Sequence, residues 1–283
     1  MIVRDYDFSV ARQGNVMNLY CIGDLHIGSE AFLESAFDKI CEISAKDKNA
    51  YFILSGDLID DDRPTTRIMR RAMFNDRPDA LKQEDRQHLT WLDNFVAPKL
   101  LKLIRKDRCL GILEGDHWRQ YSNGMTSGQY LCSRHKFPYL GTGQAILRLH
   151  FAYKSGSVYT VKLHTHHGKG GGITEAADIQ ALEKMSRQYE GMHLFIRGHS
   201  HKPKFLPFVR YVDSAERPPQ VRTREGFLVN SGSFRQGVVL NSVDYAEDNL
   251  YPPTSTRCPV IVFTGYKHSS YEINLSAVLT EPL

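Results

Sequence analysis

The dipeptide Gly-Asp ends a short apolar run three times in this chain. The three stretches are LYCIGDLH (19–26), YFILSGDLID (51–60) and LGILEGDHW (110–118). Short apolar runs bounded by turn residues are typical of buried strands, and a glycine lets the backbone turn sharply where such a strand ends. The repetition therefore predicts a sheet in which three strands each deliver an aspartate to the turn that follows.

Helical patterns alternate with strand-like runs as far as residue 200, which predicts an α/β core. The stretch KSGS (154–157) separates two alternating runs and predicts a hairpin, so part of the sheet system is expected to be antiparallel. After residue 200 the chain becomes strand-rich, which favours a second sheet. The strands expected before that point are 17–23, 51–55, 110–114, 145–152, 158–165 and 193–197.

The longest stretch without a strand pattern is 61–107, which carries two helix-like segments. Pro98 is expected to break the second of them, because proline removes a helical hydrogen bond. We interpret 61–107 as a helical insertion in a single domain that spans residues 1–283. A chain of 283 residues with 41% hydrophobic content is able to build one large core.

Composition argues against several classes of protein. The N-terminus, MIVRDYDFSV, is charged where a signal peptide is apolar, and no run approaches the ~18–20 apolar residues of a membrane span. Five cysteines without a CxxC pair indicate neither a disulfide framework nor a thiolate zinc site. A net charge of +4 does not by itself indicate a nucleic-acid partner. We expect a soluble, cytoplasmic protein with no membrane partner, and its oligomeric state stays open.

Aspartates and histidines gather just after the predicted strands. Because the carboxyl ends of neighbouring strands meet at one edge of an α/β sheet, these side chains are expected to converge. Carboxylate and imidazole groups suit Zn, Mn or Fe, and the set is too large for one ion. Two ions about 3.5–4 Å apart, bridged by a carboxylate, can hold a hydroxide for in-line attack on phosphorus. The residues are Asp24, His26, Asp57, Asp116, His117, His164, His166, His167, His199 and His201.

These residues belong to five motifs that follow one another in order: D-x-H (24–26), GD-x-x-D (56–60), GDH (115–117), HHG (166–168) and GHSH (198–201). Together they resemble the motifs of the calcineurin-like metallophosphoesterases, and VNSGSF (229–234) resembles the N-x-GS segment that often follows GHxH there. The resemblance covers residues 20–235. It implies an α/β fold, a four-layer αββα sandwich of two mixed β-sheets, with a dinuclear metal site. It also implies a hydrolase acting on phosphoric ester bonds.

Position by position, the resemblance assigns Asp24, His26, Asp57 and His201 to one metal ion, with Asp57 bridging to the second. Asp60 is expected to brace the turn after Asp57 and not to bind metal.

For the second ion, the resemblance adds Asp116, His199 and one histidine of residues 164–167 to the bridging Asp57. We choose His166, which follows the apolar run and opens HHG; His164 is an alternative on the same face, and His167 is the weakest candidate.

His117 is expected to orient the phosphate and to protonate the leaving oxygen, as general acids do. A plain structural role for this histidine is the alternative.

Asp116 departs from the pattern, because the family usually has a neutral Asn at this place. An additional carboxylate is expected to hold the second ion more tightly but to make it a weaker Lewis acid, which shifts activity to higher pH. If Asp116 does not contact metal, the site would hold one ion.

Two basic features suggest substrate contacts. Lys169 lies in GKGGG (168–172), which precedes a helical pattern and is expected either to bind phosphate or to act only as a flexible turn. Arg63 begins an arginine series at i, i+4, i+7 and i+8 that fits either a nucleic-acid backbone or a solvated helix face. The other members of the series are Arg67, Arg70 and Arg71.

We therefore expect a phosphoester hydrolase with two divalent ions, Mn in the first place and Fe or Zn as alternatives. Phosphodiesters, including nucleic acid, are the favoured substrates, as for a nuclease. A phosphomonoesterase or a small cyclic-nucleotide phosphodiesterase is the alternative activity. A non-catalytic metal-binding module of the same fold is the alternative from another class.

Overall fold

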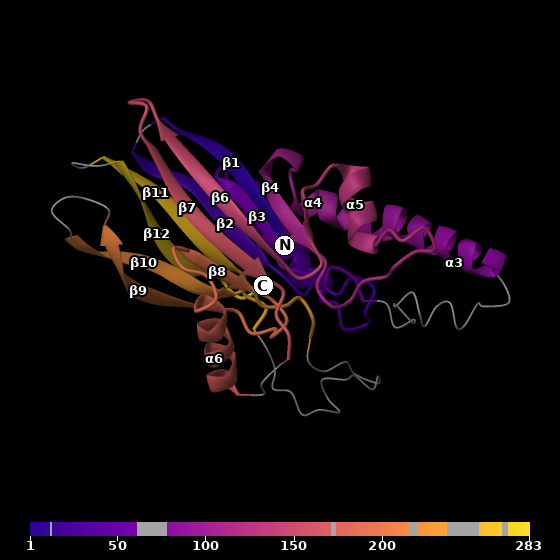
Figure 1. The fold of residues 1–283 in the computed structure, drawn as a ribbon. Helices are drawn as coiled ribbons and strands as arrows, with labels where there is room; N and C mark the ends of the chain where they lie inside the picture. Colours follow the sequence, from indigo (N-terminus) through magenta and orange to yellow (C-terminus); the bar gives the residue numbers. More distant parts are fainter. Residues whose placement is uncertain (12, 61–77, 171–173, 215–219, 237–254, 268–270) are drawn as a thin grey trace.

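Two six-stranded sheets form the centre of the molecule in the computed structural model, which describes residues 1–283 except 12, 61–77, 171–173, 215–219, 237–254 and 268–270 (Figure 1). Sheet A holds, in spatial order, β1 (Ile2–Val10), β6 (Gln144–Tyr153), β7 (Val158–His166), β8 (Leu194–Arg197), β10 (Gln220–Asn230) and β9 (Lys204–Ser214). Sheet B holds β12 (Tyr271–Leu279), β11 (Pro259–Lys267), β2 (Gly14–Ile22), β3 (Ala50–Leu54), β4 (Cys109–Leu113) and β5 (Tyr139–Gly141).

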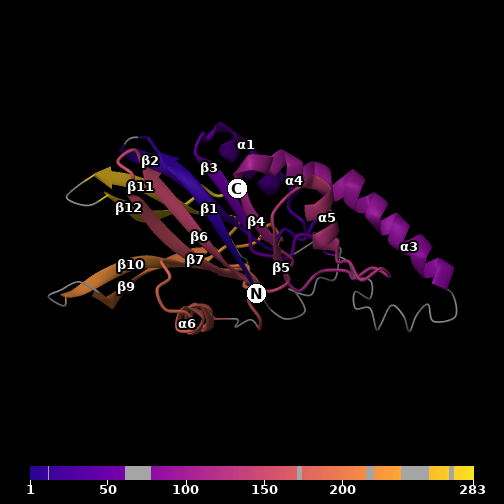
Figure 2. The same ribbon diagram turned by 45° about the horizontal axis from the view of Figure 1, so that its top comes forward.

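Three apolar clusters separate the layers. The first lies between the two sheets and includes Leu19 and Ile53 from sheet B with Leu149 and Leu163 from sheet A. The second packs α1 (Glu34–Lys46), α4 (Ala97–Leu103) and α5 (Ser127–His135) on the outer face of sheet B. The third packs α6 (Glu175–Ser186) on the outer face of sheet A. Figure 2 shows α6 on one side of the sheets and α1 and α4 on the opposite side, so the four-layer αββα arrangement is confirmed.

Strand directions are mixed in both sheets, as the sequence predicts. β6 and β7 form an antiparallel hairpin around residues 154–157. β2, β3 and β4 run parallel in sheet B, and β7 and β8 run parallel in sheet A. Loops that leave the carboxyl ends of these five strands therefore emerge at one end of each sheet.

All six expected strands are present, within a few residues of their predicted bounds. β1 and β5 were not among the strands predicted from the sequence. β1 shows strict alternation of half-buried and exposed positions, with Tyr6 and Phe8 facing the core between the sheets. This period of two was a readable strand signal.

The helical part of the predicted insertion is present as α3 (Pro78–Trp91), a π-helical turn over Leu92–Val96, and α4. Pro98 does not break this rod, because it lies in the first turn of α4, where a missing N–H costs little. The π-helical turn directly precedes it. Residues 61–77, and with them Arg63 and the other arginines of its series, lie outside the described residues.

Among the described helices, none has the length and apolarity that crossing a bilayer requires.

Candidate metal centre

The predicted ligands meet where the two sheets present the carboxyl ends of their parallel strands. Asp24 and His26 follow β2, and Asp57 follows β3. His199 and His201 follow β8 of the other sheet. Among the described residues, two compact ligand groups combine side chains from both sheets: Asp24–His26–His201 and Asp57–His167–His199. A third group, His26–Asp60–His117, comes from loops of sheet B alone. In each group one ligand atom per residue lies within 4.8 Å of the others.

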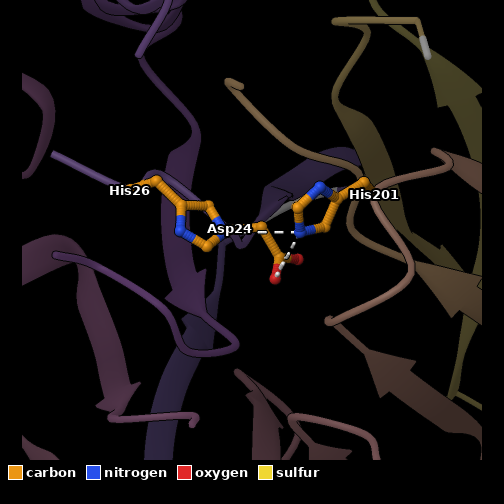
Figure 3. Close-up of side chains that lie close together, drawn as sticks. All are labelled: Asp24, His26 and His201. Carbon is orange, nitrogen blue, oxygen red and sulfur yellow. Dashed lines mark hydrogen bonds and ion pairs between the residues drawn. The ribbon is translucent and has the colours of Figure 1, made fainter. Parts of the chain in front are cut away.

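In the first group, His26 and His201 approach Asp24 from opposite sides (Figure 3). The two Nε2 atoms are 3.3 Å apart, and His201 Nε2 lies 3.6 Å from Asp24 Oδ1. His26 Nδ1 lies 3.2 Å from Asp60 Oδ2, and a carboxylate there favours a hydrogen on Nδ1. The Nε2 lone pair of His26 then faces the other ligand atoms, which is the arrangement that a cation stabilises.

The second group is centred on Asp57, whose two carboxylate oxygens have different partners. Oδ1 accepts hydrogen bonds from the backbone N–H groups of Asp116 (2.7 Å) and His117 (2.9 Å). Oδ2 lies 3.1 Å from His167 Nε2. His167 Nδ1 is 2.9 Å from the Ser55 carbonyl oxygen, which must accept, so Nδ1 carries a hydrogen and Nε2 is available to a metal.

His166, the residue chosen from the sequence, lies outside both groups. Its Nδ1 accepts a hydrogen bond from the Gly168 N–H at 2.7 Å. Successive residues along a strand point to opposite faces, and Leu163 and Val161 of β7 face the core between the sheets. His167 continues that inward face, and the structure therefore favours His167 over His166 as the ligand.

His164 shares the outward face of His166 and is also absent from the two groups. Its ring lies 4.5 Å, between centroids, from the ring of Tyr189, and its Nε2 lies 3.2 Å from Gln144 Oε1. Burial lowers the pKa of His164 to about 4, which keeps it neutral. It is a packed histidine of the sheet.

Asp116 stands at the rim. Its side chain is 51% exposed, and Oδ2 lies 3.5 Å from His199 Nδ1. The Asp116 side chain lies close to the second group but is not part of it. Its backbone N–H donates a hydrogen bond to Asp57 Oδ1. Lys169 is exposed and lies two residues after His167.

His117 faces the centre from the loop after β4. Its Nδ1 lies 2.9 Å from Asp60 Oδ1, and its Nε2 lies 4.0 Å from Asp57 Oδ2. The hydrogen bond to Asp60 and the neighbouring Asp57 carboxylate raise the pKa of His117 against the effect of burial. Asp60 thus orients two histidines, His26 and His117. This role exceeds the bracing of a turn that the sequence suggested.

Backbone strain is concentrated at this centre. Among the described residues, six that are not glycine have positive φ, and five of them are Asp24, His26, Asp57, His199 and His201. A positive φ is unfavourable for a residue with a Cβ and persists only where its surroundings enforce it. The fold therefore holds these five residues in backbone conformations that they disfavour on their own.

A polar wall behind Asp24 supplies part of that enforcement. The Asp24 carbonyl oxygen accepts hydrogen bonds from Ser233 Oγ (2.9 Å) and from the Phe234 N–H (3.1 Å). Ser231 Oγ accepts from Ser55 Oγ at 2.8 Å, which links this segment to the loop after β3. The segment VNSGSF therefore buttresses the site.

The protonation of the two groups fits a metal centre. Burial raises the pKa of Asp24 to about 8. Burial opposes protonation of His167, but hydrogen bonding to Asp57 and the charges of Asp24 and Asp57 raise its pKa to about 9. In the protein without metal, protons take the place of cations among these buried ligands. The carboxylate and imidazole set suits Mn, Fe or Zn.

Comparison with known proteins agrees with this geometry. The family model described as calcineurin-like phosphoesterase matches residues 17–203. That match covers more than half of the chain, and the chain belongs to the calcineurin-like phosphoesterase family. The search of curated proteins found no match.

Two solved structures show a similar arrangement of the chain. One is calcineurin-like phosphoesterase YfkN from Bacillus subtilis, with 11% identity, a TM-score of 0.39, and coverage of 94% of this chain and 90% of that one. The other is Vps29 from Chaetomium thermophilum, with 12% identity, a TM-score of 0.33, and coverage of 95% and 99%. At such values neither protein bears on what this chain does.

Proposed function

We propose that this protein is a phosphoester hydrolase with a dinuclear metal centre. Asp24, His26 and His201 would hold one ion, His167 and His199 the other, and Asp57 would bridge them. The observation that carries the proposal is the pair of ligand groups, each of which combines residues of both sheets. When bound, two divalent ions polarise a phosphoryl oxygen and activate water. We propose Mn as the native metal, with Fe or Zn as alternatives.

The residues around the metals would divide the remaining work. His117, held by Asp60 and with its pKa raised by that hydrogen bond, would donate a proton from Nε2 to the leaving oxygen. Asp116, at the rim beside His199, would approach the second ion. Lys169, exposed after His167, would contact the substrate phosphate.

For the substrate we propose phosphodiesters, including nucleic acid, on the strength of the arginine series that begins at Arg63. Phosphomonoesters and small cyclic nucleotides are the alternatives. The His117–Asp60 pair supports catalysis over a non-catalytic metal-binding module, which would not need an oriented acid. Five free, buried cysteines support a location in the reducing cytoplasm.

The test combines metal analysis with a substrate panel. Purified protein is loaded with Mn²⁺, Fe²⁺ or Zn²⁺, and hydrolysis is measured with bis-p-nitrophenyl phosphate, p-nitrophenyl phosphate, and single- and double-stranded DNA. We expect two ions per chain and faster turnover of the diester than of the monoester. Loading without turnover of any ester would contradict the enzyme proposal, and inertness toward DNA and RNA would remove nucleic acid from it.

A further inference from the structure

A buried carboxylate on α6 gathers positive charge beside the metal centre. Asp178 is 1% exposed, and Lys202 Nζ and Lys204 Nζ lie 3.3 and 3.5 Å from its Oδ2. Arg197 Nη1 lies 3.9 Å from its Oδ1, and the Arg197 side chain is 4% exposed. Three cations therefore surround one carboxylate in a place with little access to water.

Two of these cations flank the loop that carries His199 and His201. Arg197 is the last residue of β8 and directly precedes Gly198, and Lys202 directly follows His201. The cations on both sides of the loop GHSH (198–201) thus converge on the same side chain, Asp178. One carboxylate holds both ends of the loop that carries two of the candidate ligands.

This loop needs such a hold. His199 and His201 have φ values of 69° and 57°, in the left-handed region that residues with a Cβ avoid. Inside the loop, the His199 N–H donates to Asp24 Oδ1 and Oδ2 at 3.0 and 2.9 Å, and Asn230 Nδ2 donates to Ser200 Oγ. These bonds hold its middle, whereas Asp178 holds its ends.

Arg197 extends the same anchor to the loop that carries His167. Its Nη2 donates a hydrogen bond to the Gly170 carbonyl oxygen at 3.1 Å. Asp178 therefore acts, through Arg197, on the segments that bring both His167 and His199 to the second ligand group.

We propose that Asp178 is a positioning residue that presets the two strained histidines of the GHSH loop for metal binding. This inference rests on the proposed metal centre for its functional meaning. Its structural content is a constraint on His199 and His201 that exists before any ion is bound. A buried ion cluster contributes little net stability, because desolvation offsets the attraction between its charges. The cluster is therefore better suited to fixing the geometry of the loop than to adding stability.

The experiment compares Asp178→Asn with Glu175→Gln. Glu175 pairs with Lys204 from the exposed side of the same helix end and has no contact with Arg197 or Lys202 among the described ion pairs. Glu175→Gln therefore removes one carboxylate from the same helix end, at an exposed position. Mn²⁺ affinity is measured by titration calorimetry, and the imidazole resonances of His199 and His201 are followed by NMR in the metal-free protein.

We expect Asp178→Asn to weaken Mn²⁺ binding about 10- to 100-fold and to shift both imidazole signals, with Glu175→Gln within about twofold of wild type. A folded Asp178→Asn protein with wild-type affinity and unmoved signals would overturn the proposal. If Asp178→Asn does not fold, Lys202→Gln releases one end of the loop only. It should shift the His201 signal more than the His199 signal, and no shift would count against the inference.

The two readouts separate this inference from the function on which it rests. A wild-type protein that binds no metal contradicts the proposed metal centre. Shifted imidazole signals in the metal-free variants would still support the constraint on the GHSH loop.

Discussion

In the proposed hydrolase, His117 is the residue on which catalysis most directly depends. Its Nδ1 is held by Asp60 at 2.9 Å, so Nε2 is the atom left to face a leaving group. His117→Asn should lower kcat by about 10²- to 10⁴-fold while leaving Mn²⁺ affinity within a few-fold of wild type, because only proton donation is lost. Steady-state kinetics and calorimetry on the same preparation measure the two quantities.

A matched histidine is available as the control for that substitution. His150 Nε2 also lies 2.9 Å from a carboxylate oxygen, that of Asp5. However, His150 lies on β6 and belongs to none of the ligand groups. His150→Asn should leave kcat unchanged. A kcat of wild-type size in His117→Asn would exclude this residue as the acid.

The neighbours His166 and His167 offer a test of ligand identity within one dipeptide. His167→Ala should weaken Mn²⁺ binding by more than about 100-fold, because it removes a nitrogen 3.1 Å from Asp57 Oδ2. His166→Ala removes a side chain that faces away and should change affinity less than about threefold. Equal losses in the two variants would contradict the assignment to His167.

At this scale the sequence predicted most of the candidate ligands that converge, but not which histidine of residues 164–167 joins them. Asp24, His26, Asp57, His199 and His201 all lie in the two ligand groups. The choice of His166 went against the alternation of β7, in which inward residues have odd numbers. The double role of Asp60 required three-dimensional knowledge, since no spacing rule connects it to both histidines.

Among the elements, the turn after β4 shows how a glycine is required by a close approach. Gly115 has a φ of 86°, and a Cβ added to it would overlap the carboxylate and backbone nitrogen of Asp57. Gly124 has nearly the same φ, 87°, but nothing lies within 4 Å of its added Cβ. Both positions have a positive φ, but only at Gly115 would an added Cβ also overlap neighbouring atoms.

Gly115→Ala and Gly124→Ala therefore form a matched pair. Gly124→Ala should destabilise the fold by about 1 kcal/mol, because alanine disfavours positive φ, and Gly115→Ala should destabilise it by more, because its Cβ also overlaps Asp57. Only Gly115→Ala should also displace Asp57 and abolish the binding of at least one ion. Thermal unfolding measures the loss of stability in the two variants, and metal stoichiometry measures whether Asp57 is displaced. Wild-type stoichiometry in Gly115→Ala would show that the Asp57 loop accommodates the added Cβ without loss of a metal ion.

The elements themselves were predictable where their period was plain. The parallel strands of both sheets and the hairpin at 154–157 follow from apolar runs and turn residues. β1 was missed although its alternation is regular, because an apolar residue, Val3, lies on its exposed side and a charged residue, Arg4, on its inward side. The continuity of α3 into α4 could not be foreseen, since a π-helical turn over Leu92–Val96 joins the two helices just ahead of Pro98.

For the whole molecule, the sequence could predict that ligands meet at strand ends but not which strands share a sheet. The centre lies where sheet B contributes Asp24 and Asp57 and sheet A contributes His167, His199 and His201. Metal ions at this place would tie the two sheets together. Metal binding, protonation and global stability are therefore coupled.

In the metal-free protein, Asp24 and His167 have pKa values of about 8 and about 9, above the ordinary values of 3.8 and 6.5. These two groups bind more protons in the native state than in the unfolded chain, so the stability that they contribute is lost as the pH rises, between about 4 and 8 for Asp24 and between about 6.5 and 9 for His167. Histidines with lowered pKa, such as His164, contribute with the opposite sign below about pH 6.5. A metal ion must displace these protons. At pH 7 this costs about tenfold in affinity at Asp24 and about 100-fold at His167, and the cost vanishes above pH 9.

Thermal unfolding with excess Mn²⁺ and with chelator should therefore show a difference in Tm that widens between pH 6 and pH 8.5. Calorimetry at pH 7 in buffers of different ionisation enthalpy should register the release of about two protons, one from each of these residues. Asp57 and Asp60 have lowered pKa values and titrate below this window. A Tm difference independent of pH would contradict this prediction. It would mean that Asp24 and His167 are already deprotonated in the metal-free protein.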